Sequence, residues 1–262
     1  MEIEKLQNIR MFLLDMDGTF YLGNQIFDCS YTFVKKVEET GREFMFLTNN
    51  SSKDRFAYQE KLRRMGFEVA PQRIFTSGEA TTIYLNQHFP GKRVYLVGTD
   101  SLTREFERAG VQLVEEEPDL AVLGFDTGLT YQKLWKLCDY VRAGIPYIAT
   151  HPDFNCPIET GFMPDIGATI AFVEASTGVL PKVIGKPHKE IVDAVLDKVG
   201  LPREQIAMVG DRLYTDIAMG ANGGITSILV LSGETTREDV EKSDIQPDYI
   251  FEDLGDLAAH LR

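Results

Sequence analysis

The chain has 262 residues, of which 44% are hydrophobic and 26% charged, and its 40 acidic against 27 basic side chains give a formal net charge of −13. A chain of this composition is not expected to be disordered, and it is long enough to bury a substantial core. An acidic chain without a long basic run binds nucleic acid phosphates poorly, so we expect no nucleic acid partner.

The three cysteines, Cys29, Cys138 and Cys156, have unrelated spacings, which match neither a disulfide framework nor a zinc site. We expect reduced thiols and a cytoplasmic location. The N-terminal segment MEIEKLQNIR leads into a short apolar run, Met11–Leu14, which is too short for a signal peptide. No stretch reaches the roughly 20 apolar residues of a membrane span, so we expect no membrane association.

Short apolar runs alternate with segments of helical periodicity from one end of the chain to the other. In chain order, the first part predicts strands and helices at 11–14 (strand), 30–40 (helix), 44–47 (strand) and 53–65 (helix). The middle predicts strands at 94–97, 120–123 and 147–149, and helices at 100–109, 130–143 and 167–177. The last part predicts a strand fragment at 183–184, strands at 206–209, 228–231 and 249–251, and helices at 188–199, 215–221 and 256–261.

This alternation predicts an α/β fold with a parallel sheet covered by helices. The pattern in the middle of the chain predicts a second α/β unit, with approximate boundaries near residues 80 and 182. We expect a discontinuous core of residues 1–80 and 182–262 and an inserted domain of residues 81–181.

Polar residues follow four of the predicted strands, at the edge where parallel sheets bind ligands. The segments are Asp15-Met16-Asp17-Gly18-Thr19, Thr48-Asn49-Asn50-Ser51, Gly185-Lys186-Pro187 and Gly210-Asp211-Arg212 with Asp216 five residues after Asp211. Each segment has a plain structural alternative: turns for the first, a helix N-cap for the second, a surface charge for Lys186 and a first-turn helix acid for Asp216. Four such polar segments, each following a predicted strand, favour a functional site.

The residue types fit phosphoryl transfer. Of two carboxylates placed two residues apart, one can attack while the other handles a proton, as Asp15 and Asp17 would. Clustered carboxylates, with Asp211 added, repel one another unless a hard cation such as Mg²⁺ lies among them. Lys186, the Thr48 hydroxyl and backbone N–H groups around Gly18 are suited to phosphoryl oxygens.

These segments resemble the motifs of the haloacid dehalogenase superfamily: Asp15–Thr19 is similar to its DxDGT motif, and Thr48, Lys186 and the Asp211/Asp216 pair are similar to the other three, in the right order. The finer matches resemble the NagD-like, or p-nitrophenyl phosphatase, branch. That resemblance implies a Rossmann-like core and an inserted α/β cap of the C2 type, for which the interval between Thr48 and Lys186 leaves room.

The resemblance also implies roles for the core residues. Asp15 would attack phosphorus and Asp17 would act as general acid and base. The Asp15 carboxylate, the Asp17 carbonyl and Asp211 would hold Mg²⁺. Asp216 would hold a metal-bound water or orient Lys186.

The resemblance further implies a phosphate pocket and a small substrate. Thr48, Asn49, Lys186 and Gly18 would bind the phosphoryl group. Residues of two loops in the inserted domain would shape the substrate pocket, unless these loops are ordinary turns; they are His151, Asp153, Asn155, Met163 and Asp165.

The function expected is Mg²⁺-dependent hydrolysis of small phosphate monoesters such as sugar phosphates, nucleotides or related metabolites, with p-nitrophenyl phosphate as an in vitro substrate. A phosphomutase or a phospho-aspartate signalling domain could use the same Asp, Thr, Lys and Mg²⁺ set. The filled catalytic positions argue against a silent binding module. The resemblance also allows a homodimer.

Overall fold

The computed structural model describes residues 3–158 and 161–262. The chain divides into two compact units. The first unit comprises residues up to Thr48, Lys61–Phe75 and Lys186–Arg262, and the second comprises Asn49–Glu60 and Thr76–Gly185. The predicted domain boundaries stay a prediction.

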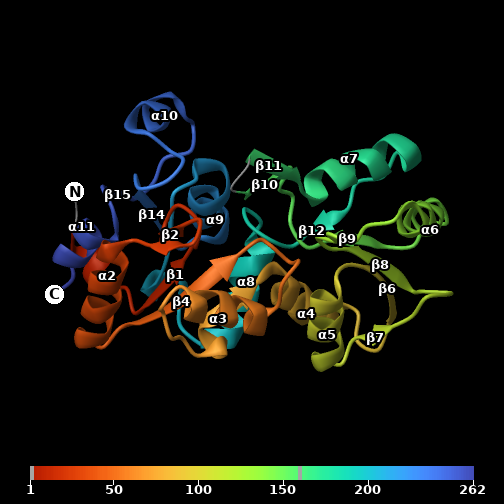
Figure 1. Cartoon of the computed structure of the whole chain (residues 1–262), viewed down its shortest axis with the longest axis horizontal. Coiled ribbons are helices and arrows are strands. Elements are labelled where there is room, and N and C mark those ends of the chain that lie inside the picture. Colours follow the sequence, from red (N-terminus) through yellow and green to blue (C-terminus); the bar gives the residue numbers. More distant parts are fainter. Residues whose placement is uncertain (1–2, 159–160) are drawn as a thin grey trace. The chain divides into compact units, whose positions relative to one another are not determined.

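The first unit is built on a six-stranded sheet in which β1 (Met11–Leu14) lies between β13 (Ile206–Gly210) and β4 (Glu43–Thr48). Figure 1 labels β1 and β4. β1 pairs in parallel with both neighbours, so Leu14 lies opposite Val209 on one side and Phe46 on the other. All four residues of β1 are buried, as a short continuous apolar run predicts. The sheet order is β15 (Tyr249–Phe251), β14 (Thr226–Val230), β13 (Ile206–Gly210), β1, β4 (Glu43–Thr48) and β5 (Ile74–Thr76).

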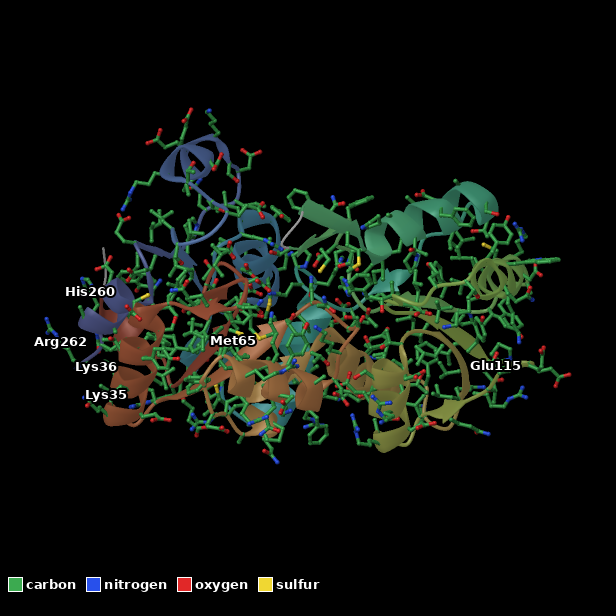
Figure 2. All side chains as sticks on the ribbon, in the orientation of Figure 1. Lys35, Lys36, Met65, Glu115, His260 and Arg262 are labelled. Atoms are coloured by element: carbon green, nitrogen blue, oxygen red, sulfur yellow. The ribbon has the colours of Figure 1, made fainter. Side chains whose placement is uncertain are left out.

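Helices flank this sheet, and α2 shows how they bury apolar side chains. In α2 (Asp28–Glu39), Phe33 and Val37 are buried, whereas Lys35 projects outward (Figure 2). The predicted end of the helix at 188–199 is confirmed: α8 (Lys189–Val199) is followed by Gly200 in the left-handed conformation with φ +68°. The helices with residues in this unit are α1 (Ile3–Gln7), α2, α3 (Arg55–Arg64, in this unit from Lys61 on), α8 (Lys189–Val199), α9 (Ala218–Gly223), α10 (Arg237–Lys242) and α11 (Leu254–Ala259).

The second unit has its own parallel sheet, in the order β12 (Lys182–Val183), β9 (Tyr147–Ala149), β8 (Leu120–Leu123), β6 (Arg93–Val97) and β7 (Gln112–Leu113). Three of its helices begin after a threonine whose side chain accepts a backbone N–H, the usual N-cap arrangement. The helices of the unit are α4 (Ser77–His88), α5 (Asp100–Arg108), α6 (Tyr131–Arg142) and α7 (Ile166–Thr177), and a hairpin joins β10 (Asn155–Ile158) to β11 (Gly161–Pro164).

The predicted α/β class is confirmed, but several elements were not predicted. The strongest case is α4, whose first turns bury small and polar residues together, from Ser77 to Thr82. A helix buried around most of its circumference has no amphipathic stripe, so periodicity does not reveal it. The other unpredicted elements include the short hairpin of β2 (Tyr21–Leu22) and β3 (Gln25–Ile26), and the β10–β11 hairpin.

The described residues include no helix with both the length and the apolar character needed to cross a bilayer. This finding agrees with the absence of long apolar runs in the sequence.

Aromatic side chains pack against one another around Phe46 of β4, in the core of the first unit. The ring of Phe20 meets the rings of Phe46 and Phe67 edge to face, at centroid distances of 4.7 and 4.9 Å. Phe20 and Phe46 are fully buried. Phe20 belongs to the loop between β1 and β2, which also carries Asp17, so this packing anchors that loop.

We predict that Phe46→Ala lowers the free energy of unfolding by about 3–5 kcal/mol, because it removes a buried aromatic side chain and leaves a cavity. Urea unfolding followed by circular dichroism measures the change. The matched control is Leu22→Ala in the same unit, which is 62% exposed and should change the value by less than about 0.5 kcal/mol. Equal effects of the two substitutions would contradict this account of the core.

Candidate functional site

The candidate site lies where neighbouring strands of the first unit end. Asp15 follows β1 and Asp211 follows β13. The two strands are paired in parallel, and the Asp15 amide continues the ladder by donating to the Val209 carbonyl at 2.9 Å. Parallel neighbours end at the same edge of a sheet, so both acids are delivered to one place.

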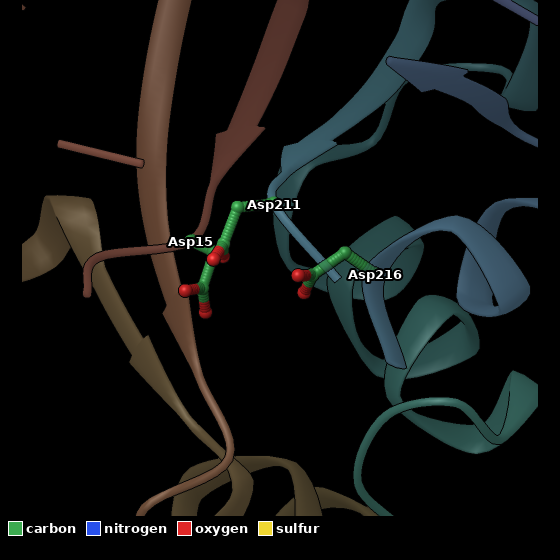
Figure 3. Close-up of side chains that lie close together, drawn as sticks. All are labelled: Asp15, Asp211 and Asp216. Carbon is green, nitrogen blue, oxygen red and sulfur yellow. The ribbon is translucent and has the colours of Figure 1, made fainter. Parts of the chain in front are cut away.

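Asp15, Asp211 and Asp216 form a cluster in which one carboxylate oxygen from each lies within 4.8 Å of the others. Figure 3 shows the three side chains turned toward one another. Asp216 comes from the π-helical turn η3 (Leu213–Ile217) that follows β13. Single π-turns are frequent at functional sites, where they redirect a side chain. The structure of the first unit therefore brings together these three acids, which the sequence places at strand ends.

Lys186 joins two of these acids. Its Nζ lies 2.6 Å from Asp15 Oδ1 and 2.7 Å from Asp216 Oδ1, and it also donates to the Leu47 carbonyl at 3.4 Å. The Lys186 side chain is only 3% exposed. Burial lowers the pKa of Lys186, but the carboxylates of Asp15 and Asp216 outweigh that effect and raise it above its usual value. Lys186 is therefore a buried cation stabilised by two carboxylates, not a surface charge.

Asp211 is enclosed by backbone. Its Oδ2 accepts from the Glu234 amide at 2.7 Å, and the Thr19 hydroxyl lies 3.5 Å from its Oδ1. The backbones at Gly18 and Gly233 approach so closely that a Cβ on either would overlap this carboxylate. Gly18 also has a φ of +82°, which other residues adopt only with strain. Glycine at these two positions leaves the room that Asp211 occupies.

The acid cluster is electrostatically unfavourable without a cation. Burial raises the pKa of Asp211 to about 7, and the neighbouring carboxylates of Asp15 and Asp216 contribute to the rise. Burial also raises the pKa of Asp216, although Lys186 opposes the change. The positive charges of Lys186 and Arg212 oppose this repulsion, but two cations do not balance three carboxylates. An oxygen-only donor set with surplus negative charge suits a hard divalent cation such as Mg²⁺ or Ca²⁺.

Asp17 differs from the three clustered acids in its surroundings. Its side chain is 50% exposed, and its Oδ2 lies 4.0 Å from Lys61 Nζ. Partial burial raises the pKa of Asp17, Lys61 opposes that rise, and Asp15 adds to it. A carboxyl group that is exposed and has a raised pKa is suited to exchanging protons.

The sequence-predicted phosphate-binding residues are divided between the units. Thr48 ends β4, the strand beside β1, and is 8% exposed. Asn49 begins the second unit, where its Nδ2 donates to the Asp153 carboxylate at 3.1 and 3.2 Å. The Ser77 hydroxyl donates to the Asn49 carbonyl. The structure therefore brings Lys186 and Gly18 to the acid cluster and ties Asn49 to Asp153.

The remaining residues predicted to contact substrate lie in the second unit. His151 is fully buried, and its Nε2 lies 2.9 Å from Asp165 Oδ1. Asp165 also caps α7 by accepting from the Ile166 amide at 2.6 Å. Asn155 and Met163 belong to the two strands of the β10–β11 hairpin. The contacts of His151 and Asp165 stabilise the start of α7, and a substrate role for these residues stays a prediction.

Sequence reasoning missed the segment that follows β14. The Ser232 hydroxyl donates to the Gly18 carbonyl at 2.8 Å, and the Glu234 amide donates to Asp211. The Thr235 amide donates to the Asp211 carbonyl at 3.2 Å. The same rule that identified Asp15 would have found this segment, because it follows a predicted buried strand at the same sheet edge.

Two family models match the chain: the haloacid dehalogenase-like hydrolase model over residues 12–112 and the HAD-hydrolase-like model over residues 183–257. An acid sugar phosphatase from Staphylococcus aureus is 37% identical over 257 residues, which cover 98% of this chain and 99% of that protein.

Two solved structures are similar to this one along most of the chain. A 4-nitrophenylphosphatase from Thermotoga maritima has a TM-score of 0.95 and 48% identity, with 98% of this chain and 99% of that chain covered. A glycerol phosphate phosphatase from Mycobacterium tuberculosis, in complex with calcium, has a TM-score of 0.89 and 29% identity, with 97% of this chain and 76% of that chain covered. The family resemblance predicted from the four motifs is confirmed. The chain belongs to the haloacid dehalogenase-like hydrolases and is a phosphatase of their NagD-like, p-nitrophenylphosphatase group.

Proposed function

We propose that this phosphatase hydrolyses small phosphate monoesters, with sugar phosphates as its principal substrates, through a phosphoryl intermediate on Asp15. The observation that carries the proposal is the buried Lys186 ammonium held between Asp15 and Asp216, beside Asp211. A nucleophilic carboxylate, a fixed cation and a divalent-metal donor set are the parts that phosphoryl transfer needs. The names of the relatives, which specify sugar, glycerol and nitrophenyl phosphates, support the substrate class.

In the first step, an Asp15 carboxylate oxygen forms a bond to phosphorus as the bond from phosphorus to the ester oxygen breaks. The Asp17 carboxyl gives its proton to the leaving oxygen, and the alcohol departs. In the second step, Asp17, now ionised, takes a proton from water as the water oxygen attacks phosphorus. The bond from phosphorus to Asp15 breaks, inorganic phosphate leaves, and both acids return to their starting states.

The chain's own groups hold the phosphoryl oxygens during both steps. We assign Lys186, the Thr48 hydroxyl and the N–H groups around Gly18 to this task, and the family resemblance implies the same role for Asn49. Lys186 is positioned for it because Asp216 holds its ammonium from one side. The family resemblance implies that selection among esters depends on His151, Asp153, Asn155, Met163 and Asp165, and this role stays a prediction.

We propose that Asp15, the Asp17 backbone carbonyl and Asp211 hold Mg²⁺. When bound, the ion supplies positive charge against the phosphoryl oxygens and the acid cluster. Asp216 fits the role of orienting Lys186 better than that of a direct ligand, because one of its oxygens accepts from Lys186 and the other from the Arg212 amide at 3.2 Å. The structure of the Mycobacterium tuberculosis glycerol phosphate phosphatase in complex with calcium supports the assignment of a divalent cation.

We predict that Asp15→Asn lowers the rate of phosphate release by at least about 10³-fold, because an amide does not attack phosphorus as a carboxylate does. A panel of sugar phosphates, nucleotides and p-nitrophenyl phosphate, assayed for inorganic phosphate, measures the loss and ranks the substrates. The matched control is Asp244→Asn at an exposed position, which should retain wild-type rates. Release of an isomeric phosphate ester in place of inorganic phosphate would overturn the proposal in favour of a mutase.

We predict that Mg²⁺ raises the Tm of the chelator-treated protein more at about pH 8 than at about pH 5.5. The pKa of Asp211 is raised to about 7, so at the lower pH its carboxyl is protonated and binds the ion poorly. Without metal, this group stabilises the fold at low pH, and the contribution is lost as pH rises from about 4 to 7, where the unfolded state already holds the ionised form.

Differential scanning fluorimetry of the wild type and Asp211→Asn measures both effects. The variant should lose the Mg²⁺-induced shift at either pH and should be less sensitive to pH without metal. A Mg²⁺ shift of equal size at both pH values, or one retained in Asp211→Asn, would contradict the proposed metal site.

A further inference from the structure

We propose that Lys61 and Tyr21 are positioning residues that hold the Asp17 carboxyl for proton delivery to the leaving group. The inference rests on the proposed function, in which Asp17 is the general acid. All three residues belong to the first unit, although they come from the loop after β1, from β2 and from α3.

The three side chains form a short hydrogen-bonded chain. Lys61 Nζ donates to the Tyr21 hydroxyl at 2.9 Å, and that hydroxyl hydrogen-bonds the Asp17 carboxylate. The ammonium also lies 4.2 Å from the centroid of the Tyr21 ring and 4.0 Å from Asp17 Oδ2. The ring thus holds the ammonium through a cation–π contact while the charge faces the carboxylate.

The backbone fixes the same turn. The Gly18 amide donates to the Tyr21 carbonyl at 2.8 Å, and the Tyr21 amide donates to the Met16 carbonyl at 3.1 Å, so Asp17 is bridged to Tyr21. Tyr21 itself is 1% exposed. The backbone of Asp17 is therefore anchored to a buried residue.

The carboxyl of Asp17 needs this support because its side chain is 50% exposed, while that of Lys61 is 24% exposed. A half-exposed carboxyl would otherwise sample several rotamers, and a proton donor must lie within hydrogen-bond reach of the leaving oxygen. A misplacement of about 1 Å can cost roughly 100-fold in rate. Lys61 and Tyr21 restrict Asp17 to the orientation in which it can deliver its proton.

The test compares esters that differ in how much they need a proton. An alkyl phosphate such as glycerol phosphate expels an alkoxide, which is strongly basic and must be protonated, whereas p-nitrophenolate leaves without a proton. We expect Lys61→Met to lower kcat/KM for glycerol phosphate by about 10- to 100-fold and for p-nitrophenyl phosphate by less than about threefold. Tyr21→Phe should give a smaller loss with the same selectivity, and Lys61→Arg should restore part of the activity.

Three controls keep the outcomes distinct. Lys35→Met removes an exposed lysine of α2, with a side chain that is 77% exposed, and should leave both rates within about twofold of wild type (Figure 2). The inhibition constant of inorganic phosphate should stay unchanged in Lys61→Met. Circular dichroism and Tm confirm that each variant is folded.

Equal losses on both esters would overturn the inference and leave Lys61 as a stabilising residue only. A raised inhibition constant for phosphate would also overturn it, because Lys61 would then contact the phosphoryl group itself. Wild-type rates in both Lys61→Met and Tyr21→Phe would do the same. Failure of the wild type to hydrolyse either ester would instead refute the proposed function, and this inference with it.

Discussion

The site depends on one electrostatic arrangement: a buried ammonium, that of Lys186, lies between the carboxylates of Asp15 and Asp216. A charge this deeply buried is stable only when it is paired and hydrogen-bonded. The pairing therefore fixes Lys186, orients the oxygen of Asp15 that it contacts, and requires Asp216 at the end of a π-helical turn. In a chain with a net charge of −13, Lys186 and the proposed divalent cation together would give the site the attraction for anionic esters that the protein as a whole lacks.

The second constraint is space around Asp211. Its carboxylate is enclosed by the backbones at Gly18 and Gly233, so two loops from different parts of the chain must both carry glycine there. The Ser232 hydroxyl joins these loops by donating to the Gly18 carbonyl. The result is an acid cluster that is rigid and rich in oxygen donors, with repulsion that a divalent cation relieves. The same rigid edge of the sheet carries the loop with Asp17, whose carboxyl is left exposed and held by neighbouring residues.

Much of this could be predicted from the sequence because the chemistry lies at strand ends. Asp15, Lys186, Asp211 and Asp216 follow apolar runs, and those runs identify the strands before any contact is known. Ser232 and Glu234 follow such a run too, so the same rule locates their segment. Glu234 contributes its backbone amide, which nearly any residue type would supply, so its identity does not reveal its role. Lys61 and Tyr21 were beyond prediction, because their role depends on the packing of α3 beside a two-residue strand. Helix α4 was missed because burial around most of its circumference removes the amphipathic pattern.

The most direct test of the central claim is to identify the residue that carries the phosphoryl group. The enzyme would be quenched in acid during turnover of p-nitrophenyl phosphate, reduced with borohydride and digested, and the peptide containing Asp15 examined by mass spectrometry. Reduction of an aspartyl phosphate converts that aspartate to homoserine, and the account predicts homoserine at position 15 only, absent from the Asp15→Asn variant. Homoserine at another aspartate, or phosphate release under single-turnover conditions with no modified residue at any time point, would contradict it.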